Sequence, residues 1–223
     1  AYKDRDADIY LIKDVSLINA SVSQADVENI RQVHQIVGPI VMYIGNLESY
    51  QGIDLLVDAF AVVRQHHQQA ALVVIGGSQN HIAHYSNKVS NLGLSDVSYF
   101  LGPRPVEHIG AYLSQADILV SPRISGTNTP MKIYSYLHSG VPVVATRLPT
   151  HTQVLSDANA VLTEPHPTAY AEGLMELLEE KQLCSQLGQQ AREYAAREHG
   201  FESFAESVKH LYGAVQIALE DRS

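Results

Sequence analysis

Six short apolar runs rich in β-branched residues recur along the chain, and amphipathic stretches separate most of them. The runs lie at 39–44, 71–75, 97–100, 118–121, 141–145 and 160–162. Most of them are apolar on both faces, as strands of a parallel sheet are when helices cover both sides. The pattern predicts an α/β fold, namely a Rossmann-like, doubly wound parallel sheet with helices on both faces.

Apolar residues at helical spacing predict the helices that connect these strands. The predicted helices lie at 51–65, 81–91, 106–115 and 130–139. After the last strand, helices at 167–180, 182–197 and 201–219 form a C-terminal helical tail. In sheets of this kind, ligands bind beyond the carboxyl ends of the strands, so the loops there are the candidate site.

Composition excludes several classes of protein. The chain has 24 acidic and 15 basic residues and a net charge of −9, which argues against a nucleic-acid partner. No run approaches the roughly 18 apolar residues of a membrane-spanning helix. Residues 1–8 are polar, so we expect no signal peptide and a chain that starts within a longer protein. The single Cys184 suits a reducing cytoplasm, and we expect no metal site.

Two glycine-containing loops follow the first two predicted strands. Gly45 permits a sharp turn beneath a ligand, and Gly52 lies where helix amides could face an anion. Gly76 and Gly77 permit a close approach of a ligand to the backbone. A turn and a helix cap alone would explain these glycines equally well.

The next loop places Arg104 between Pro103 and Pro105, which stiffen the backbone on both sides of it. A guanidinium held in this way can stack on a flat base or pair with a phosphate. A solvated surface arginine is the alternative interpretation.

The loop before the predicted helix at 130–139 is the most informative. Pro130 suits the first helical turn, with Thr129 or Asn128 as the N-cap, so the amides of residues 128–132 should point outward. That end of the helix dipole favours phosphate. Lys132 adds a mobile positive charge there, which is unfavourable unless an anion is bound. A chance placement of these residues is the competing interpretation.

An ordered set of motifs carries a family resemblance. The motifs lie at 43–45 with 51–52, 76–77, 102–105, 116–122 and 139–146. The set resembles the nucleotide-sugar half of GT-B glycosyltransferases, most closely the retaining family 4 of the group 1 type, and the similarity runs from about residue 36 to the C-terminus. It implies that residues 1–32 are an interdomain linker and first helix and that 33–223 are the donor-binding domain. The N-terminal acceptor domain is then absent, and the isolated domain should be inactive.

The resemblance also implies roles for individual residues. Arg104 falls where the base is gripped, and residues 126–131 fall where the donor sugar and phosphates are contacted. The residues expected to bind the nucleotide and the donor are Gly45, Asn46, Gln51, Gly77, Arg104, Pro105, Gly126, Thr127, Asn128, Thr129, Pro130, Met131, Lys132 and Ser135. Thr127 and Lys132 are the expected catalytic positions.

The chain departs from the pattern of that family at four positions. The glutamates that usually bind the ribose and the donor sugar fall on Ser135 and Thr127. The arginine and lysine that usually neutralise the diphosphate fall on Asn46 and Gln51. Because two carboxylates and two cations are lost together, the net charge of the cleft is unchanged. Our hypothesis is that Lys132 neutralises the phosphates instead.

The resemblance therefore implies transfer of a sugar from a nucleotide diphosphate sugar, a UDP-sugar such as UDP-glucose, to a hydroxyl of a glycan or glycolipid. We expect a cytoplasmic protein at the inner face of a membrane, peripherally associated, in polysaccharide or glycolipid synthesis, with no cofactor or metal. Two alternatives are a nucleotide-binding module without catalysis and a nicotinamide-linked oxidoreductase, whose Gly-x-Gly-x-x-Gly fingerprint is missing. His151 is expected to face the cleft and contact the donor.

Overall fold

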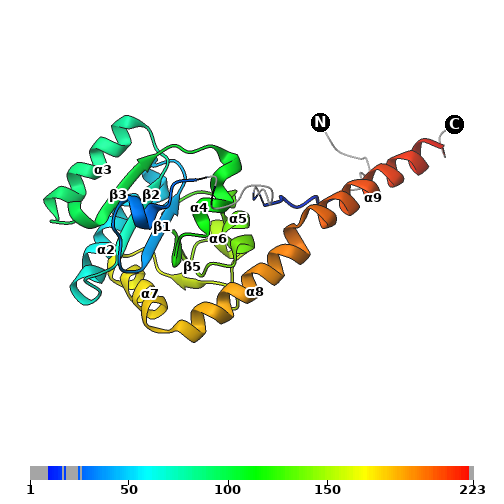
Figure 1. The fold of residues 1–223 in the computed structure, drawn as a ribbon. Coiled ribbons are helices and arrows are strands. Elements are labelled where there is room, and N and C mark those ends of the chain that lie inside the picture. Colours follow the sequence, from blue (N-terminus) through cyan, green and yellow to red (C-terminus); the bar gives the residue numbers. More distant parts are fainter. Residues whose placement is uncertain (1–9, 17, 19–24, 26, 221–223) are drawn as a thin grey trace.

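The computed structural model describes residues 10–16, 18, 25 and 27–220, so most of the predicted linker lies outside the described residues. The sheet consists of β1 (Ile40–Ile44), β2 (Ala71–Ile75), β3 (Ser98–Gly102), β4 (Ile118–Ser121), β5 (Val143–Thr146) and β6 (Val161–Thr163). The strands are parallel, in the order β3-β2-β1-β4-β5-β6 (Figure 1). This is the doubly wound arrangement that the sequence predicts, and its strand order reverses between β1 and β4.

Helices connect the strands and form the tail. They are α1 (Ile30–Val33), α2 (Ile53–His66), α3 (Gln79–Asn91), α4 (Ile109–Leu113), α5 (Lys132–Ser139), α6 (Pro149–Thr152), α7 (Pro167–Glu179), α8 (Lys181–His199) and α9 (Phe201–Glu220). Short 3-10 turns are η2 (Ser49–Gln51), η3 (Ser95–Val97) and η4 (Val106–His108). The predicted helix at 106–115 is divided into η4 and α4. The one-turn helix α6 was not predicted, because four residues carry no periodicity, whereas α1 begins within residues 1–32, the segment expected to hold the linker and first helix.

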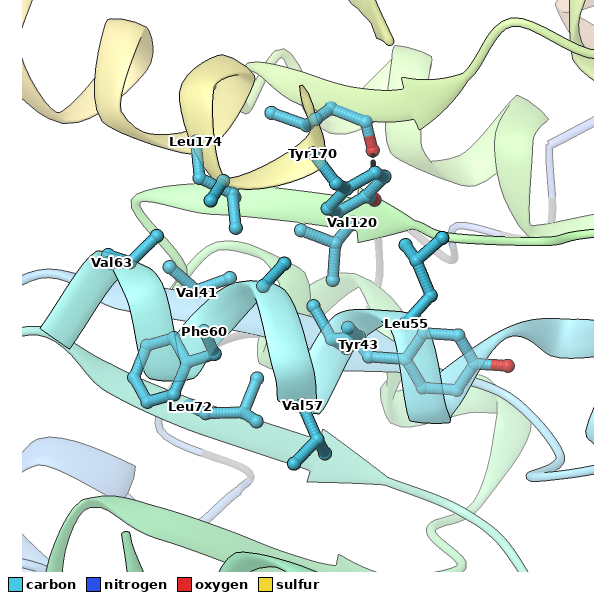
Figure 2. Packing of buried hydrophobic residues seen from close by; sticks show 14 of the residues in the cluster. Val41, Tyr43, Leu55, Val57, Phe60, Val63, Leu72, Val120, Tyr170 and Leu174 are labelled. Atoms are coloured by element: carbon cyan, nitrogen blue, oxygen red, sulfur yellow. Dashed lines mark hydrogen bonds between the residues drawn. The ribbon is translucent and has the colours of Figure 1, made fainter. Parts of the chain in front are cut away.

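The core lies on both faces of the sheet, because successive strand residues point to opposite sides. Val41 and Tyr43 of β1 pack with residues of α2, α3 and α7, whereas Met42 and Ile44 pack with residues of α4, α5 and α8. Figure 2 shows the first of these faces, where α2 lies over the strands and Phe60 points into the cluster. The two buried faces explain why the strand sequences are continuously apolar.

The N-terminal boundary of the domain body lies earlier than residue 33. Ile30 of α1 is fully buried in the core on the α5 side of the sheet. Its amide donates to Oε1 of Gln115, from the turn after α4, at 2.8 Å. The predicted boundary after residue 32 therefore falls inside a helix that packs on the domain.

The helical tail packs on the sheet layer through α8 and then leaves it. A Cβ at Gly188 would lie 2.2 Å from the carbonyl oxygen of Gly140, so α8 and the end of α5 are in close backbone contact. Arg192 of α8 donates to the carbonyl oxygen of Ser139 at 2.7 Å. In Figure 1, α9 extends away from the body of the domain. Within the described residues, no helix combines the length and apolarity needed to cross a membrane.

The burial of Phe60 in the cluster of Figure 2 and the exposure of Phe201 predict how these two phenylalanines respond to truncation. Phe60 is fully buried, so Phe60→Ala should lower the free energy of unfolding by about 3–5 kcal/mol. Phe201 is 76% exposed, so Phe201→Ala should change the free energy of unfolding by less than about 0.5 kcal/mol. Urea denaturation of both variants measures the difference. Similar losses in the two variants would contradict this assignment of the core.

Candidate functional site

The loops after β1 and β4 separate at the point where the strand order reverses, and two adjoining cavities open there. Gly45 and Asn46 line both of them. The first, called here the α3 cavity because it lies beside the start of α3, has a volume of about 420 Å³. The second, the α5 cavity, lies beside the start of α5 and has a volume of about 280 Å³. This is the position at which doubly wound sheets bind ligands.

Two glycines keep the floor of these cavities open. Gly76 has a φ of 114°, and a Cβ there would lie 2.1 Å from the carbonyl oxygen of Gly45. A Cβ at Gly45 would lie 3.0 Å from the Tyr43 hydroxyl and 3.4 Å from Nζ of Lys132. The close approach of two backbone segments requires a glycine at position 76, and the glycine at position 45 leaves space before Lys132.

Lys132 places its ammonium at the α5 cavity. The residue is half-buried as a whole, but Nζ lies among protein atoms, 3.8 Å from the centroid of the Tyr43 ring. Nζ donates to Oε1 of Gln51 at 3.1 Å. Burial lowers the pKa of Lys132 well below its usual value, and the charge of Arg123 lowers it further. The expectation of a mobile positive charge is therefore wrong, because the ammonium is enclosed and held.

Arg123 is a second cation at the same cavity, and the sequence prediction missed it. It follows β4, is only 6% exposed, and its guanidinium lies over the Tyr50 ring with Cζ 5.1 Å from the centroid. Nε donates to the carbonyl oxygen of Ser125 at 2.7 Å, and Nη1 to that of Asn128 at 3.0 Å. A basic residue two positions after the strand at the switch point was the signal that could have identified it.

These two cations share one cavity without a carboxylate. The cavity is lined by Gly45, Asn46, Tyr50, Gln51, Arg123, Asn128, Pro130, Met131 and Lys132. None of these residues is acidic, and the ion pairs found in the described part of the chain include neither Lys132 nor Arg123. A buried charge is costly unless it is paired. The α5 cavity therefore has the electrostatic character of an anion-binding site.

The start of α5 differs from the prediction. The helix begins at Lys132 with Met131 as its N-cap, and no side chain caps it. Thr129 donates its hydroxyl hydrogen to Oε1 of Gln153 at 3.1 Å, and Oδ1 of Asn128 accepts from Nη2 of Arg123 at 3.3 Å. Neither residue is available as the predicted N-cap. The side chains that were expected to cap the helix instead hold the loop around Arg123.

The remaining predicted residues divide between the two cavities and the surrounding structure. The α5 cavity includes Gly45, Asn46, Gln51, Asn128, Pro130, Met131 and Lys132, and the α3 cavity includes Gly45, Asn46, Gly77 and Arg104. Pro105, Gly126, Thr127, Thr129 and Ser135 line neither cavity. Thr127 is exposed, and Ser135 is only 2% exposed. Their predicted roles at the donor sugar and the ribose stay predictions.

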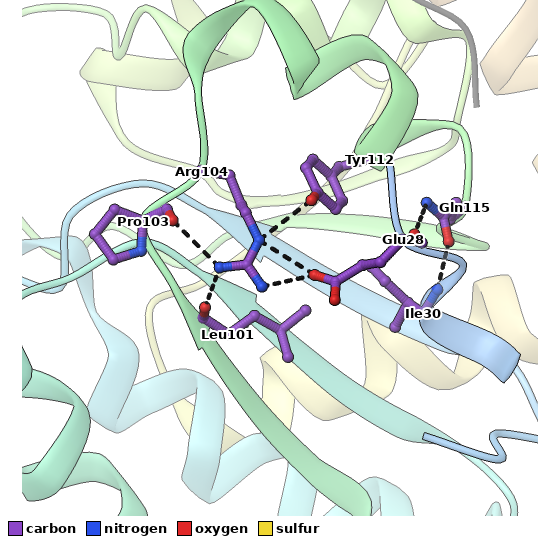
Figure 3. Close-up of polar contacts among 7 residues, drawn as sticks. All are labelled: Glu28, Ile30, Leu101, Pro103, Arg104, Tyr112 and Gln115. Carbon is purple, nitrogen blue, oxygen red and sulfur yellow. Dashed lines mark hydrogen bonds and ion pairs between the residues drawn. The ribbon is translucent and has the colours of Figure 1, made fainter. Parts of the chain in front are cut away.

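The α3 cavity is mainly apolar, with Arg104 on its wall. Its apolar residues are Ile44, Ile75, Pro103, Ile109 and Tyr112. The guanidinium of Arg104 donates to the carboxylate of Glu28 at 2.6 Å and to the Tyr112 hydroxyl at 3.2 Å (Figure 3). Glu28 raises the pKa of Arg104. The alternative of a solvated surface arginine is therefore wrong, because this guanidinium is half-buried and paired.

His151 lies beneath the loop that carries Arg123 and does not face the cavity, contrary to the prediction. It is 0% exposed, and its Nε2 lies 2.9 Å from the hydroxyl of Ser121. Its Nδ1 lies 2.8 Å from the carbonyl oxygen of Thr146, whose hydroxyl donates to the carbonyl oxygen of Arg123 at 2.5 Å. Burial lowers the pKa of His151 to about 4, with a contribution from the charges of Lys132 and Arg123. A neutral imidazole therefore supports the loop from below.

Comparison with known proteins places this geometry in a family. A family model described as glycosyl transferases group 1 matches residues 26–194. The D-inositol 3-phosphate glycosyltransferases of Corynebacterium diphtheriae and Corynebacterium jeikeium are 28% and 29% identical to the chain over 183 residues, which cover 78% of it. The matched region is 42% and 43% of those proteins, so the chain spans less than half of their length.

Solved structures share the fold. Anabaena HepE in complex with UDP and glucose has a TM-score of 0.76 at 19% identity, over 86% of this chain and 53% of that one. Sucrose-phosphate synthase from Thermosynechococcus elongatus has a TM-score of 0.76 at 22% identity, over 93% and 52%. The C-terminal domain of LpcC, a group 1 family protein from Francisella tularensis, has a TM-score of 0.67 at 20% identity, over 81% and 99%. Nearly all of that C-terminal domain is therefore matched.

The burial of His151 predicts a dependence of stability on pH. His151 has an ordinary pKa of 6.5 in the unfolded chain and about 4 in the folded chain, so the unfolded state binds more protons between these values. Its contribution to the free energy of unfolding is complete above about pH 6.5 and is lost as the pH falls toward 4. Between pH 7 and pH 5, the free energy of unfolding of the unmodified chain should fall by about 2 kcal/mol more than that of His151→Gln.

Urea denaturation at the two pH values measures this difference. The exposed His84 provides the matched control, since His84→Gln should keep the pH dependence of the unmodified chain. Identical pH dependence in His151→Gln and the unmodified chain would contradict a buried, neutral His151.

Proposed function

The chain belongs to the group 1 glycosyl transferases, as a C-terminal domain of the GT-B type, and from that membership we propose that it binds the sugar donor of a glycosyltransferase. The proposed donor is a nucleotide diphosphate sugar, held across the two adjoining cavities. The base occupies the apolar α3 cavity, and the diphosphate occupies the α5 cavity. The ligand crosses Gly45 and Asn46, the residues that the two cavities share.

The observation that carries this proposal is the pair of buried cations without a carboxylate. Lys132 and Arg123 face a cavity of about 280 Å³ in which Gln51 and Asn46 supply only neutral groups. A diphosphate would pair with both cations and relieve the cost of their burial. An apolar ligand would leave both charges unpaired.

The proposed reaction follows from this arrangement. The bond between the anomeric carbon and the diphosphate oxygen breaks while an acceptor hydroxyl forms the new glycosidic bond and passes its proton to the departing diphosphate. Negative charge then grows on the departing diphosphate, where Lys132 and Arg123 stabilise it. Gln51 orients the ammonium of Lys132 through its hydrogen bond. Most of the rate enhancement in this proposal comes from positioning and electrostatics, with the chain's own cations in place of a metal.

The proposal extends to the identity of the donor, the acceptor and the place where the reaction occurs. We propose a UDP-sugar, such as UDP-glucose, and the solved complexes of Anabaena HepE with UDP and with UDP-glucose support this choice. The acceptor would be a hydroxyl of a polysaccharide or glycolipid, bound by a part of the protein outside this chain, at the cytoplasmic face of a membrane. Thr127 and Ser135 carry no carboxylate, which favours a nucleotide-binding module without catalysis as the second candidate.

Nucleotide binding tests the proposed function directly. A thermal-shift screen of the 223-residue chain against UDP, GDP, ADP and their sugars should show stabilisation by a uridine nucleotide. At 100 times its dissociation constant, the ligand should raise the free energy of unfolding by about 2.7 kcal/mol. If none of these diphosphates stabilised the chain, the proposal would be wrong.

The cation in the α5 cavity gives a second prediction. Lys132→Met keeps the length of the side chain and removes its charge, so the affinity for UDP should fall at least about tenfold, which is ~1.4 kcal/mol. The affinity for uridine, which has no phosphate, should stay unchanged. Titration calorimetry measures both, with the exposed Lys181→Met as the control. Unchanged UDP affinity would remove Lys132 from the phosphate site.

A further inference from the structure

The nitrogen atoms of the Arg104 guanidinium all donate to protein oxygens (Figure 3). Nε and Nη2 donate to Oε1 of Glu28 at 3.2 and 2.6 Å, and Nε also reaches the Tyr112 hydroxyl at 3.2 Å. Nη1 donates to the carbonyl oxygens of Leu101 and Pro103. The N–H edge with which an arginine grips a phosphate is therefore occupied by the protein itself.

The backbone at Glu28 is held in place independently of Arg104. Glu28 lies directly before α1, and its carbonyl oxygen accepts from Nε2 of Gln115 at 3.0 Å. Oε1 of the same Gln115 accepts from the amide of Ile30 at 2.8 Å. These two contacts fix the backbone from Glu28 to Ile30, and the side chain of Glu28 pairs with Arg104. The pair is partly exposed, with 33% of the Glu28 side chain and 26% of the Arg104 side chain accessible.

Arg104 would otherwise be a third cation at the joined cavities. It lines the α3 cavity, whereas Lys132 and Arg123 line the α5 cavity. A ligand with an anionic end and a flat end could then bind in either direction. With its charge balanced by Glu28 and most of its N–H groups used, Arg104 has little donor capacity left for a phosphate, and the flat face of a guanidinium can stack on an aromatic ring.

We propose that Glu28 is a positioning residue that sets the direction of the ligand. By pairing with Arg104, it makes this arginine unavailable to phosphate. The diphosphate then binds at Lys132 and Arg123, and the base binds against the wall formed by Arg104. This inference rests on the proposed function and adds a specificity-determining residue to it. Glu28 need not touch the ligand, because it acts through the guanidinium.

The test measures inorganic pyrophosphate and uridine separately by titration calorimetry. Glu28→Ala should bind pyrophosphate about fivefold more tightly than the unmodified chain, since Arg104 is released. It should bind uridine about threefold more weakly, since the stacking face is no longer fixed. A merely structural role for Glu28 would weaken both ligands together. Glu28→Gln keeps an acceptor oxygen without the charge, so its affinities for the two ligands should lie between those of Glu28→Ala and those of the unmodified chain.

Two further variants isolate the cause. Glu107 is exposed on the neighbouring η4, so Glu107→Ala removes the same charge without releasing Arg104 and should leave both affinities unchanged. In Glu28→Ala/Arg104→Ala, the pyrophosphate affinity should return to that of the unmodified chain. The inference would be overturned if Glu28→Ala did not gain affinity for pyrophosphate. It would also be overturned if Glu107→Ala showed the same gain, or if the gain persisted in the double variant. The UDP affinity of the unmodified chain decides the proposed function separately.

Discussion

Two positive charges enclosed by protein without a carboxylate form the constraint on which the site depends. Burying such charges costs several kcal/mol each when they stay unpaired. The chain holds Lys132 by Gln51 and the Tyr43 ring, and Arg123 by carbonyl oxygens and the Tyr50 ring. Neutral partners of this kind orient a cation and leave its charge for a ligand.

The sheet supplies the geometry that this arrangement needs. At the end of β1, where its short pairing with β4 has ended, the amide of Ile44 donates to the hydroxyl of Tyr136 from α5 at 2.8 Å. This contact fixes the start of α5, and hence Lys132, relative to Gly45. At the ends of β4 and β5, His151 and Thr146 support the backbone at Arg123. The two cations are thus positioned by separate elements that meet at the switch point.

The sequence predicts the fold well, because continuously apolar strands and amphipathic helices leave one arrangement of layers. The location of the site follows from the same logic: Gly45 and Lys132 were predicted from loops after strands, and Gln51 from the family resemblance. Arg123 was missed because its burial depends on how the loop through Asn128 curls around it. The role of Glu28 could not be predicted, because its partner Arg104 lies 76 residues away in the sequence. The expected orientation of His151 toward the cleft was wrong because its buried partner Ser121 is also distant in the sequence.

A crystal structure of the chain with UDP would show whether the two cations bind the diphosphate. We expect the diphosphate between Nζ of Lys132 and the guanidinium of Arg123, with the uracil ring in the α3 cavity. A diphosphate bound at Arg104, or density for UDP outside the two cavities, would contradict this expectation.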